Sequence, residues 1–181
     1  YDRVLLDNVQ GSYDATTHLA TRGHQRIAII NGRRDSTVGE ERFAGYKTAM
    51  SEWGLPIEDE LVDFGEFTTQ GGYEAAVRLM SLQAPPSALL VTNYYMTLGA
   101  VMAAYELNVR IPAFLSLIGF GNFELSDIAR PPLTVIDQPI EEMGTAISRI
   151  LTRRIIDADE SPPITMKFPA ILRERESTRA L

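Results

Sequence analysis

Short, nearly continuous runs of apolar residues alternate with longer stretches in which apolar residues recur every three or four positions. The clearest runs span residues 27–30, 88–91 and 115–118, and weaker ones span 61–64 and 134–136. Runs without polar alternation are typical of strands buried on both faces, as in a parallel sheet. The pattern predicts an α/β fold: an open, doubly wound, mostly parallel sheet with helices on both faces.

The intervening stretches have helical spacing. The predicted helices cover about residues 11–22, 37–53, 73–80, 98–105 and 139–157. The segment Thr37-Val38-Gly39-Glu40 resembles a capping box, which places the start of the second helix near Thr37. The last helix follows Pro139, a residue that suits a first helical turn. Its apolar face consists of Ile140, Met143, Ile147, Ile150 and Leu151.

Composition narrows the class of protein. The 181 residues include 24 acidic and 17 basic side chains, a net charge of −7, which argues against a broad basic surface for nucleic-acid phosphates. The chain has no cysteine, so a disulfide framework, a cysteine-ligated metal and a cysteine nucleophile are excluded. No apolar run approaches the ~18 residues of a membrane span. The first residue is not Met and no signal-peptide pattern follows it, so we expect a piece of a longer chain.

Polar and aromatic residues follow the predicted strands. They occur in residues 31–36, 65–67, 92–95, 119–122 and 137–138. In doubly wound sheets, ligands bind beyond the carboxyl ends of the strands, and this mixture of amides and rings suits a small polar ligand. Each residue also has a purely structural interpretation. Glycines permit turns, Asn93 caps a helix, Arg42 is a solvated helix charge, and the aromatic residues pack in a core or an interface.

Catalytic patterns are weak. The sequence has no phosphate-binding loop, no dinucleotide fingerprint and no nucleophile elbow. Its two histidines, His18 and His24, have a spacing that matches no usual metal pair, so structural roles are expected. Acidic pairs fall on helix starts or polar faces, where solvation and the helix dipole explain them. We therefore predict no catalytic residue, no metal site, no cofactor and no enzymatic activity.

Several motifs, in their order and spacing, resemble the LacI/GalR family of bacterial transcriptional regulators over nearly the whole chain. They include Leu6-Asp7-Asn8, Gly23-His24-Gln25-Arg26-Ile27-Ala28, Glu41-Arg42-Phe43-Ala44-Gly45-Tyr46, Ser116-Leu117-Ile118-Gly119-Phe120, Pro131-Pro132-Leu133-Thr134 and Arg175-Glu176-Ser177. The resemblance implies a two-lobed, periplasmic-binding-protein-like type I effector domain. A helix-turn-helix headpiece and most of the first lobe would precede Tyr1. Residues 8–136 would form the C-terminal lobe, 138–160 a crossover helix segment of the N-terminal lobe, and 163–181 a return to the C-terminal lobe.

The resemblance also implies site residues. Effector contacts are expected from Ser36, Val38, Arg42, Phe67, Asn93, Tyr94, Asn122 and Gln138, and dimer contacts from Leu98, Met102, Leu125 and Ile128. The sequence departs from the family twice, because Tyr94 replaces the Asp that usually follows Asn93, and Gly121-Asn122 replaces an Asp pair. Since glycine has no side chain to accept hydrogen bonds from hydroxyls, a plain neutral sugar is not expected. Arg42, placed at a cleft edge, is expected to matter for the ligand and little for stability.

The function implied by the resemblance is ligand sensing and dimerisation in a cytoplasmic LacI-type repressor. A small-molecule effector would shift lobe closure and operator affinity. The partners would be that effector, a second copy, and operator DNA through the headpiece alone, with no membrane. One alternative is a periplasmic-type solute-binding transport protein, which would carry a signal peptide. Another is an α/β hydrolase, which would need a base or a metal cluster at the strand ends.

Overall fold

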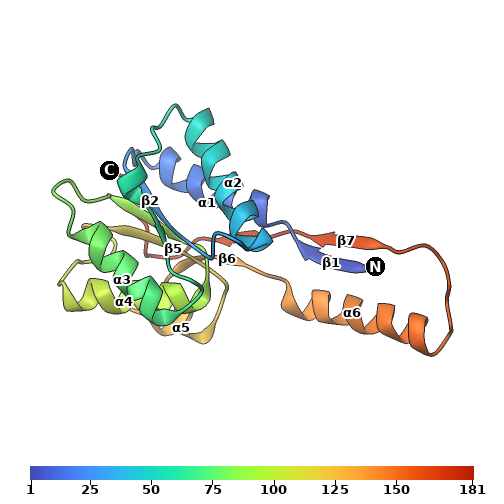
Figure 1. Cartoon of the computed structure of the whole chain (residues 1–181). Coiled ribbons are helices and arrows are strands. Elements are labelled where there is room, and N and C mark those ends of the chain that lie inside the picture. Colours follow the sequence, from blue (N-terminus) through green and yellow to red (C-terminus); the bar gives the residue numbers. More distant parts are fainter.

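The computed structural model covers residues 1–181 and describes every side chain except that of Leu125. Helices and strands alternate along most of the chain (Figure 1). The strands are β1 (Arg3–Leu6), β2 (Ile27–Asn31), β3 (Val62–Phe64), β4 (Ala88–Val91), β5 (Ser116–Phe120), β6 (Thr134–Asp137), β7 (Thr165–Phe168) and β8 (Ile171–Arg173). The helices are α1 (Asn8–Thr21), α2 (Thr37–Glu52), α3 (Thr69–Met80), α4 (Tyr94–Glu106), α5 (Glu124–Ile128) and α6 (Ile140–Ile155), with a short 3-10 helix at Asp59–Leu61.

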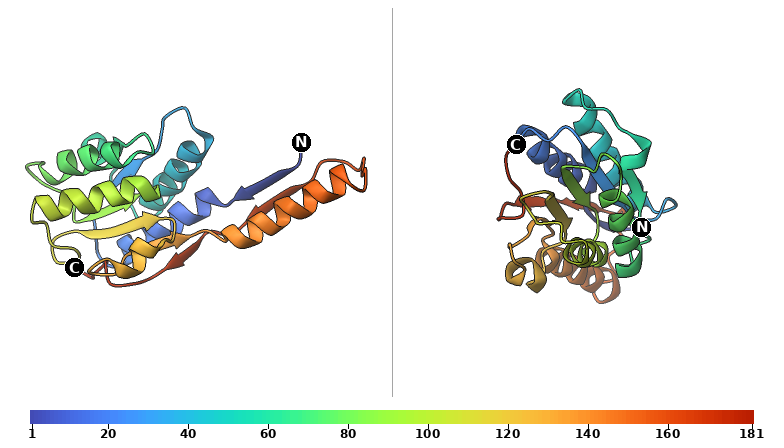
Figure 2. Two further views of the ribbon diagram at one scale, coloured as in Figure 1. Left: turned by 90° about the horizontal axis from the view of Figure 1, so that it is seen from below. Right: turned by 90° about the vertical axis from the view of Figure 1, so that its left-hand side faces the viewer.

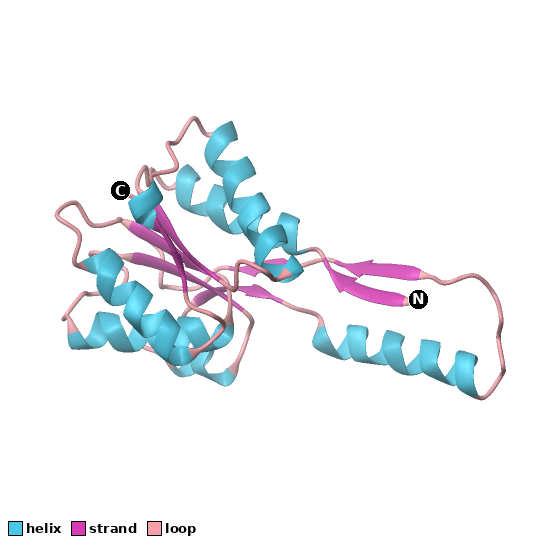
Figure 3. Ribbon diagram, in the orientation of Figure 1, coloured by secondary structure: helices cyan, strands magenta, loops and turns pink.

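Six strands form the main sheet in the order β3-β2-β4-β5-β6-β8. The first five strands are parallel, and only β8 runs antiparallel to its neighbour. Helices α1 and α2 cover one face, and α3, α4 and α5 cover the other (Figures 1 and 3). The predicted open, doubly wound, mostly parallel sheet is confirmed.

The sheet separates two apolar cores, which explains why its strands lack a polar face. In β2, Ala28 and Ile30 pack with α3 and α4, whereas Ile27 and Ile29 pack with α1 and α2. All four side chains are fully buried. Successive side chains of a strand point to opposite faces, so helices on both sides require an apolar residue at every position.

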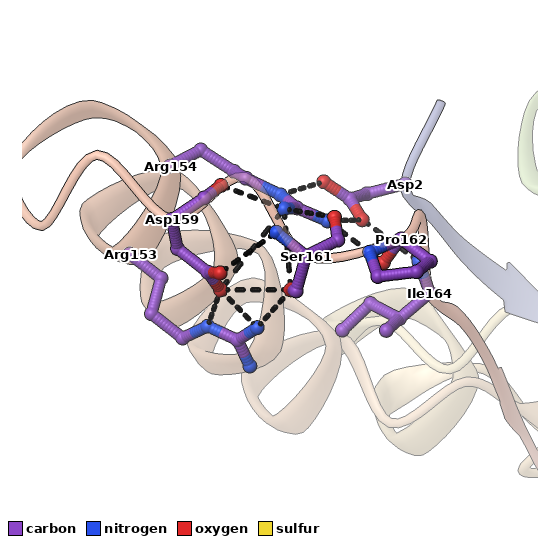
Figure 4. A network of polar contacts seen from close by, with 7 residues as sticks. All are labelled: Asp2, Arg153, Arg154, Asp159, Ser161, Pro162 and Ile164. Atoms are coloured by element: carbon purple, nitrogen blue, oxygen red, sulfur yellow. Dashed lines mark hydrogen bonds and ion pairs between the residues drawn. The ribbon is translucent and has the colours of Figure 1, made fainter.

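A second body extends from the main sheet (Figure 2). There β1 pairs in parallel with β7, whose residues follow those of β1 by about 160 positions, and α6 lies beside β1. The far end of α6 is fixed by Arg154, which donates to both carboxylate oxygens of Asp2 at 2.8 Å (Figure 4). Asp2 also accepts from the Ile164 backbone, and Arg154 reaches the Asp159 carbonyl. The guanidinium and these hydrogen bonds hold the pKa of Asp2 well below its usual value.

The apolar face of α6 has little to pack on. Ala146 is the only fully buried residue of the helix, while Ile140, Ile147, Leu151 and Ile155 are exposed. Isolated apolar side chains are common on surfaces, but a stripe along one helix face indicates a surface that another element covers. None of the described helices is long and apolar enough to cross a membrane.

Several local boundaries differ from the prediction. Helix α2 begins at Thr37 as predicted, but its cap is Ser36, whose hydroxyl accepts from the Gly39 amide, so the predicted capping box is wrong by one residue. Helix α1 begins at Asn8 because Asp7 caps it, earlier than the apolar periodicity indicates. Strand β1 and helix α5 were not expected, since both are too short to show a period.

Both histidines hold the C-terminal segment against the main sheet and its helices. His24 bonds the Ser87 hydroxyl at 2.9 Å and the Arg179 carbonyl at 3.1 Å, and His18 bonds the Thr178 hydroxyl at 3.0 Å. Burial lowers the pKa of His18 to about 4, so this ring is neutral at pH 7. The expected structural roles of the histidines are confirmed.

Candidate ligand-binding site

A pocket of about 320 Å³ opens at the edge of the main sheet where the carboxyl ends of the central parallel strands meet. We call it the Arg42 pocket. It brings together every predicted effector-contacting residue except Asn122. Its lining consists of Ser36, Val38, Arg42, Phe67, Asn93, Tyr94, Phe120, Phe123 and Gln138. Its size is at the lower end of the range for small-molecule sites, about 300–1,000 Å³.

Arg42 is buried, with 7% of its surface exposed. Its Nε donates to Asn8 Oδ1 at 2.9 Å, and its Nη1 donates to the Thr92 carbonyl. The guanidinium carbon lies 3.7 Å from the centroid of the Phe120 ring. These contacts hold the guanidinium plane in one position, with Nη2 donating to no described protein group.

Burial lowers the pKa of Arg42 to about 10, because the charged form loses hydration, while the Glu41 charge acts in the opposite direction. The side chain therefore stays protonated at neutral pH. The expected exposed charge at a cleft edge is wrong, because Arg42 is buried, so the small effect on stability predicted from that exposure loses its basis. In the folded chain this guanidinium satisfies two buried oxygen atoms.

Phe67 is positioned by an unusual backbone. Glu66 and Phe67 have φ angles of 53° and 60°, in the left-handed region that non-glycine residues seldom adopt. The Phe67 ring lies so close to Gly32 that a Cβ there would come within 2.0 Å of it. Gly32 is thus required for this approach of the ring. Such strained residues persist where the surrounding structure holds them.

Of the two departures from the family motifs, Tyr94 lines the pocket, and Gly121 lies against the ring of Phe123, which also lines it. The ring centroids of Tyr94 and Phe123 are 3.9 Å apart, and a Cβ on Gly121 would come within 2.4 Å of the Phe123 ring. Gly121 has a φ of 107°, which favours glycine. The space beside residue 121 is therefore occupied by an aromatic ring, and the wall formed by Tyr94 and Phe123 is aromatic.

Two predicted amides have different surroundings. Asn93 caps α4, where its Oδ1 accepts from the Tyr95 and Met96 amides, and it also lines the pocket. Asn122 lies outside the pocket, and its Oδ1 accepts from Arg175 at 2.9 Å. The capping role of Asn93 is confirmed. Its place as the cap of α4 is compatible with its predicted place in the pocket wall.

Sequence reasoning did not single out four residues of this site, although Thr92 and Phe120 lie in the strand-end segments predicted to form it. Phe120 and Phe123 line the pocket, and Asn8 and Thr92 hold Arg42 in place. Phe120 falls in the segment that follows a predicted strand, which was a usable signal, whereas nothing local marks Asn8 as a partner of a residue 34 positions later. Among the described residues, no group of three or more His, Asp or Glu side chains could hold a metal ion.

The fold and the pocket define a ligand-binding lobe: a doubly wound sheet with a small-molecule pocket at its carboxyl edge. Comparison with known proteins identifies its family. Residues 16–178 match the model of the periplasmic binding protein-like domain. The chain belongs to this family, in the form that occurs in LacI-type transcriptional regulators.

Relatives with this form cover the whole chain. The HTH-type transcriptional repressor PurR of Actinobacillus pleuropneumoniae serotype 5b (strain L20) is 35% identical over 99% of this chain and 54% of its own length. A putative LacI regulator from Bacillus cereus subsp. cytotoxis NVH 391-98 superposes with a TM-score of 0.93, at 29% identity over 99% of this chain and 64% of that one. The regulator CelR in complex with cellobiose gives 0.90, at 31% identity over 97% and 54%. The chain spans about half the length of the curated relatives it matches.

Proposed function

We propose that this chain is the ligand-sensing and dimerising region of a cytoplasmic LacI-type repressor, without enzymatic activity. The observation that carries the proposal is the Arg42 pocket at the carboxyl edge of a lobe whose relatives are transcriptional regulators. The CelR structure holds cellobiose. By analogy, a small molecule is the effector here. A solute-binding transport protein remains the alternative, and the regulator relatives favour the repressor.

The proposed domain division follows the two bodies. Residues 8–136 form the C-terminal lobe, and residues 138–160 belong to an N-terminal lobe, most of which lies outside this chain. The exposed apolar stripe of α6 supports this division, because it leaves a surface for such a lobe to cover. Of residues 163–181, β7 pairs with β1 near α6, and β8 then joins the main sheet.

The proposed mechanism is a shift between open and closed arrangements of the two lobes. A ligand in the Arg42 pocket contacts one lobe in the open state and both in the closed state, so it binds the closed state more tightly. The segments of chain that run between the two bodies transmit this change in lobe arrangement. In the dimer, the altered lobe angle changes the spacing of two headpieces on operator DNA, which must match the spacing of the half-sites.

Binding of the complete protein to DNA from its own promoter region tests this function. We expect a dissociation constant of about 10⁻⁸ M or tighter and strong salt dependence, as for specific regulators. Fluorescence anisotropy with the promoter fragment, and with a scrambled fragment as a control, measures both. A complete protein that distinguishes neither fragment would contradict the repressor proposal and leave the transport alternative.

Dimerisation is proposed through α4 and α5. Met102 is 50% exposed and Ile128 is exposed, while Leu98 is half-buried beside them on α4. Leu125, the remaining predicted contact, lies outside the described side chains. A groove of about 890 Å³ borders this surface, between the end of α4 and the segment 129–133. Its walls combine apolar residues with charged ones such as Glu106 and Arg110, and they provide area for a second copy.

Met102→Asp is expected to shift the protein from dimer towards monomer, because a carboxylate buried at an interface loses its hydration without a partner. The dimer dissociation constant should rise by roughly a factor of thirty, the effect of a hot-spot residue. Sedimentation velocity at several concentrations measures it. Ile57→Asp, at another exposed apolar position, serves as the matched control. A wild-type protein that sediments as a monomer at high concentration would contradict the proposed interface.

A further inference from the structure

The Arg42 pocket contains a buried cation without an acidic partner. Asn8 stands between Arg42 and the nearest acid, since its Oδ1 accepts from Arg42 at 2.9 Å and its Nδ2 donates to Glu41 at 2.8 Å. None of the described side chains that line the pocket is acidic. A buried charge is ordinarily paired, because desolvation is costly. The missing counter-charge is what a ligand can supply.

Two acids of the surrounding loops are already engaged by arginines. Asp35 accepts two hydrogen bonds from Arg33, and Asp137 accepts from Arg173. A ligand in the pocket therefore finds donors and neutral amides rather than carboxylates. Hydroxyl groups need acceptors, and a buried hydroxyl without a partner is costly. The electrostatics favour an anion over a neutral polyol.

The aromatic part of the pocket lining favours a ring. Tyr94 and Phe123 form an aromatic pair with centroids 3.9 Å apart, and Phe67 faces the same pocket from another loop. Gly121 leaves room for this pair, since any Cβ at that position would collide with Phe123. Aromatic side chains pack well against flat apolar faces. An aromatic molecule has such a face on both sides of its ring, whereas a sugar ring has one on a single side.

We propose that the ligand of this pocket is a small carboxylic acid built on a ring, whose carboxylate pairs with the Arg42 guanidinium while its ring packs against Tyr94 and Phe123. Nη2, which donates to no described protein group, is the donor left for the carboxylate. Arginine suits this role because its fixed planar donors match a carboxylate. The inference rests on the proposed function, since it takes the Arg42 pocket as the effector site.

Two matched pairs of probes test the ligand class in the complete regulator. Galacturonate and galactose differ in one carboxylate on a sugar ring, and benzoate and benzamide differ in charge on an aromatic ring. We expect the acid of at least one pair, at millimolar concentration, to raise the melting temperature, and its neutral partner to have no effect. The pair that responds identifies a sugar acid or an aromatic acid. Equal or stronger stabilisation by both neutral compounds, or none by either acid, would overturn the proposal.

Variants locate the effect in the pocket. Tyr94→Asp puts a carboxylate beside the proposed ligand, and we expect calorimetry to show the responding acid binding roughly tenfold weaker or worse. Tyr95→Asp is the matched control, because Tyr95 is exposed and outside the pocket lining. Arg42→Gln removes the cation, and loss of the preference for the acid over its neutral partner is expected even where the variant is less stable. Retained preference in both Tyr94→Asp and Arg42→Gln would overturn the assignment.

Failure of this inference and failure of the proposed function give different results. A neutral compound that binds in the pocket and changes promoter affinity would overturn the carboxylate proposal and leave the repressor function standing. Acid-selective binding by a protein without specific DNA binding would retain the ligand chemistry and overturn the repressor function. The two measurements use the same protein preparation.

Discussion

Gly45→Ala is expected to lower the free energy of unfolding by about 2–3 kcal/mol, the cost of overpacking a core. A Cβ at this position in α2 would lie 2.1 Å from the Val9 carbonyl oxygen and 2.9 Å from the Tyr13 amide nitrogen. Both atoms belong to the backbone of α1, so relief requires α1 and α2 to move apart along their whole contact. Guanidinium unfolding followed by far-UV circular dichroism measures the loss.

Gly144→Ala is the matched control for this change. Nothing lies within 4 Å of a Cβ placed on Gly144, which also lies within a helix. Alanine has the higher helix propensity, so we expect no loss and a gain of up to about 1 kcal/mol. Equal stability of the Gly45 and Gly144 variants would contradict the close packing of α1 on α2.

Arg42→Lys is expected to destabilise the protein by about 1–3 kcal/mol, because one ammonium cannot satisfy both Asn8 Oδ1 and the Thr92 carbonyl. The contact with the Phe120 ring is also weakened. For a chain of this size the melting temperature should fall by roughly 2–4 °C per kcal/mol. Differential scanning calorimetry without ligand measures the effect.

The control for Arg42 is Arg149→Lys, at an exposed position on α6. Conservative changes at exposed positions are usually within ±0.5 kcal/mol, so its melting temperature should match the wild type. If both lysine variants melt with the wild type, the hydrogen bonds of Arg42 contribute nothing to stability, and the predicted destabilisation is wrong.

Local patterns were sufficient for most of the secondary structure. The apolar runs of β2 and β4 are continuous because both faces are covered, and that property is visible in the sequence itself. Asn93 could be recognised as a cap because its partners are two and three residues away. Strand β1 could not be recognised, since its four residues gain their pairing from β7, at the other end of the chain.

The candidate site also has one part that the sequence could predict and another that it could not. The loops after the strands could be placed at one edge from the sequence, because carboxyl ends of parallel strands meet there. Gly121 and Tyr94 stood out only as departures from a motif. Their ring partner Phe123, and the space it takes from residue 121, appear only when the loops after β4 and β5 are folded side by side.

By itself the sequence determined the alternating fold, the Asn93 cap and the residues available at the sheet edge, because these depend on neighbours within a few positions. The tertiary structure decided how those residues act. Arg42 is a buried cation rather than a solvated charge because Asn8 and Thr92, 34 and 50 positions away, satisfy its donors. Such contacts depend on the packing of whole elements, and periodicity along the chain carries no information about it.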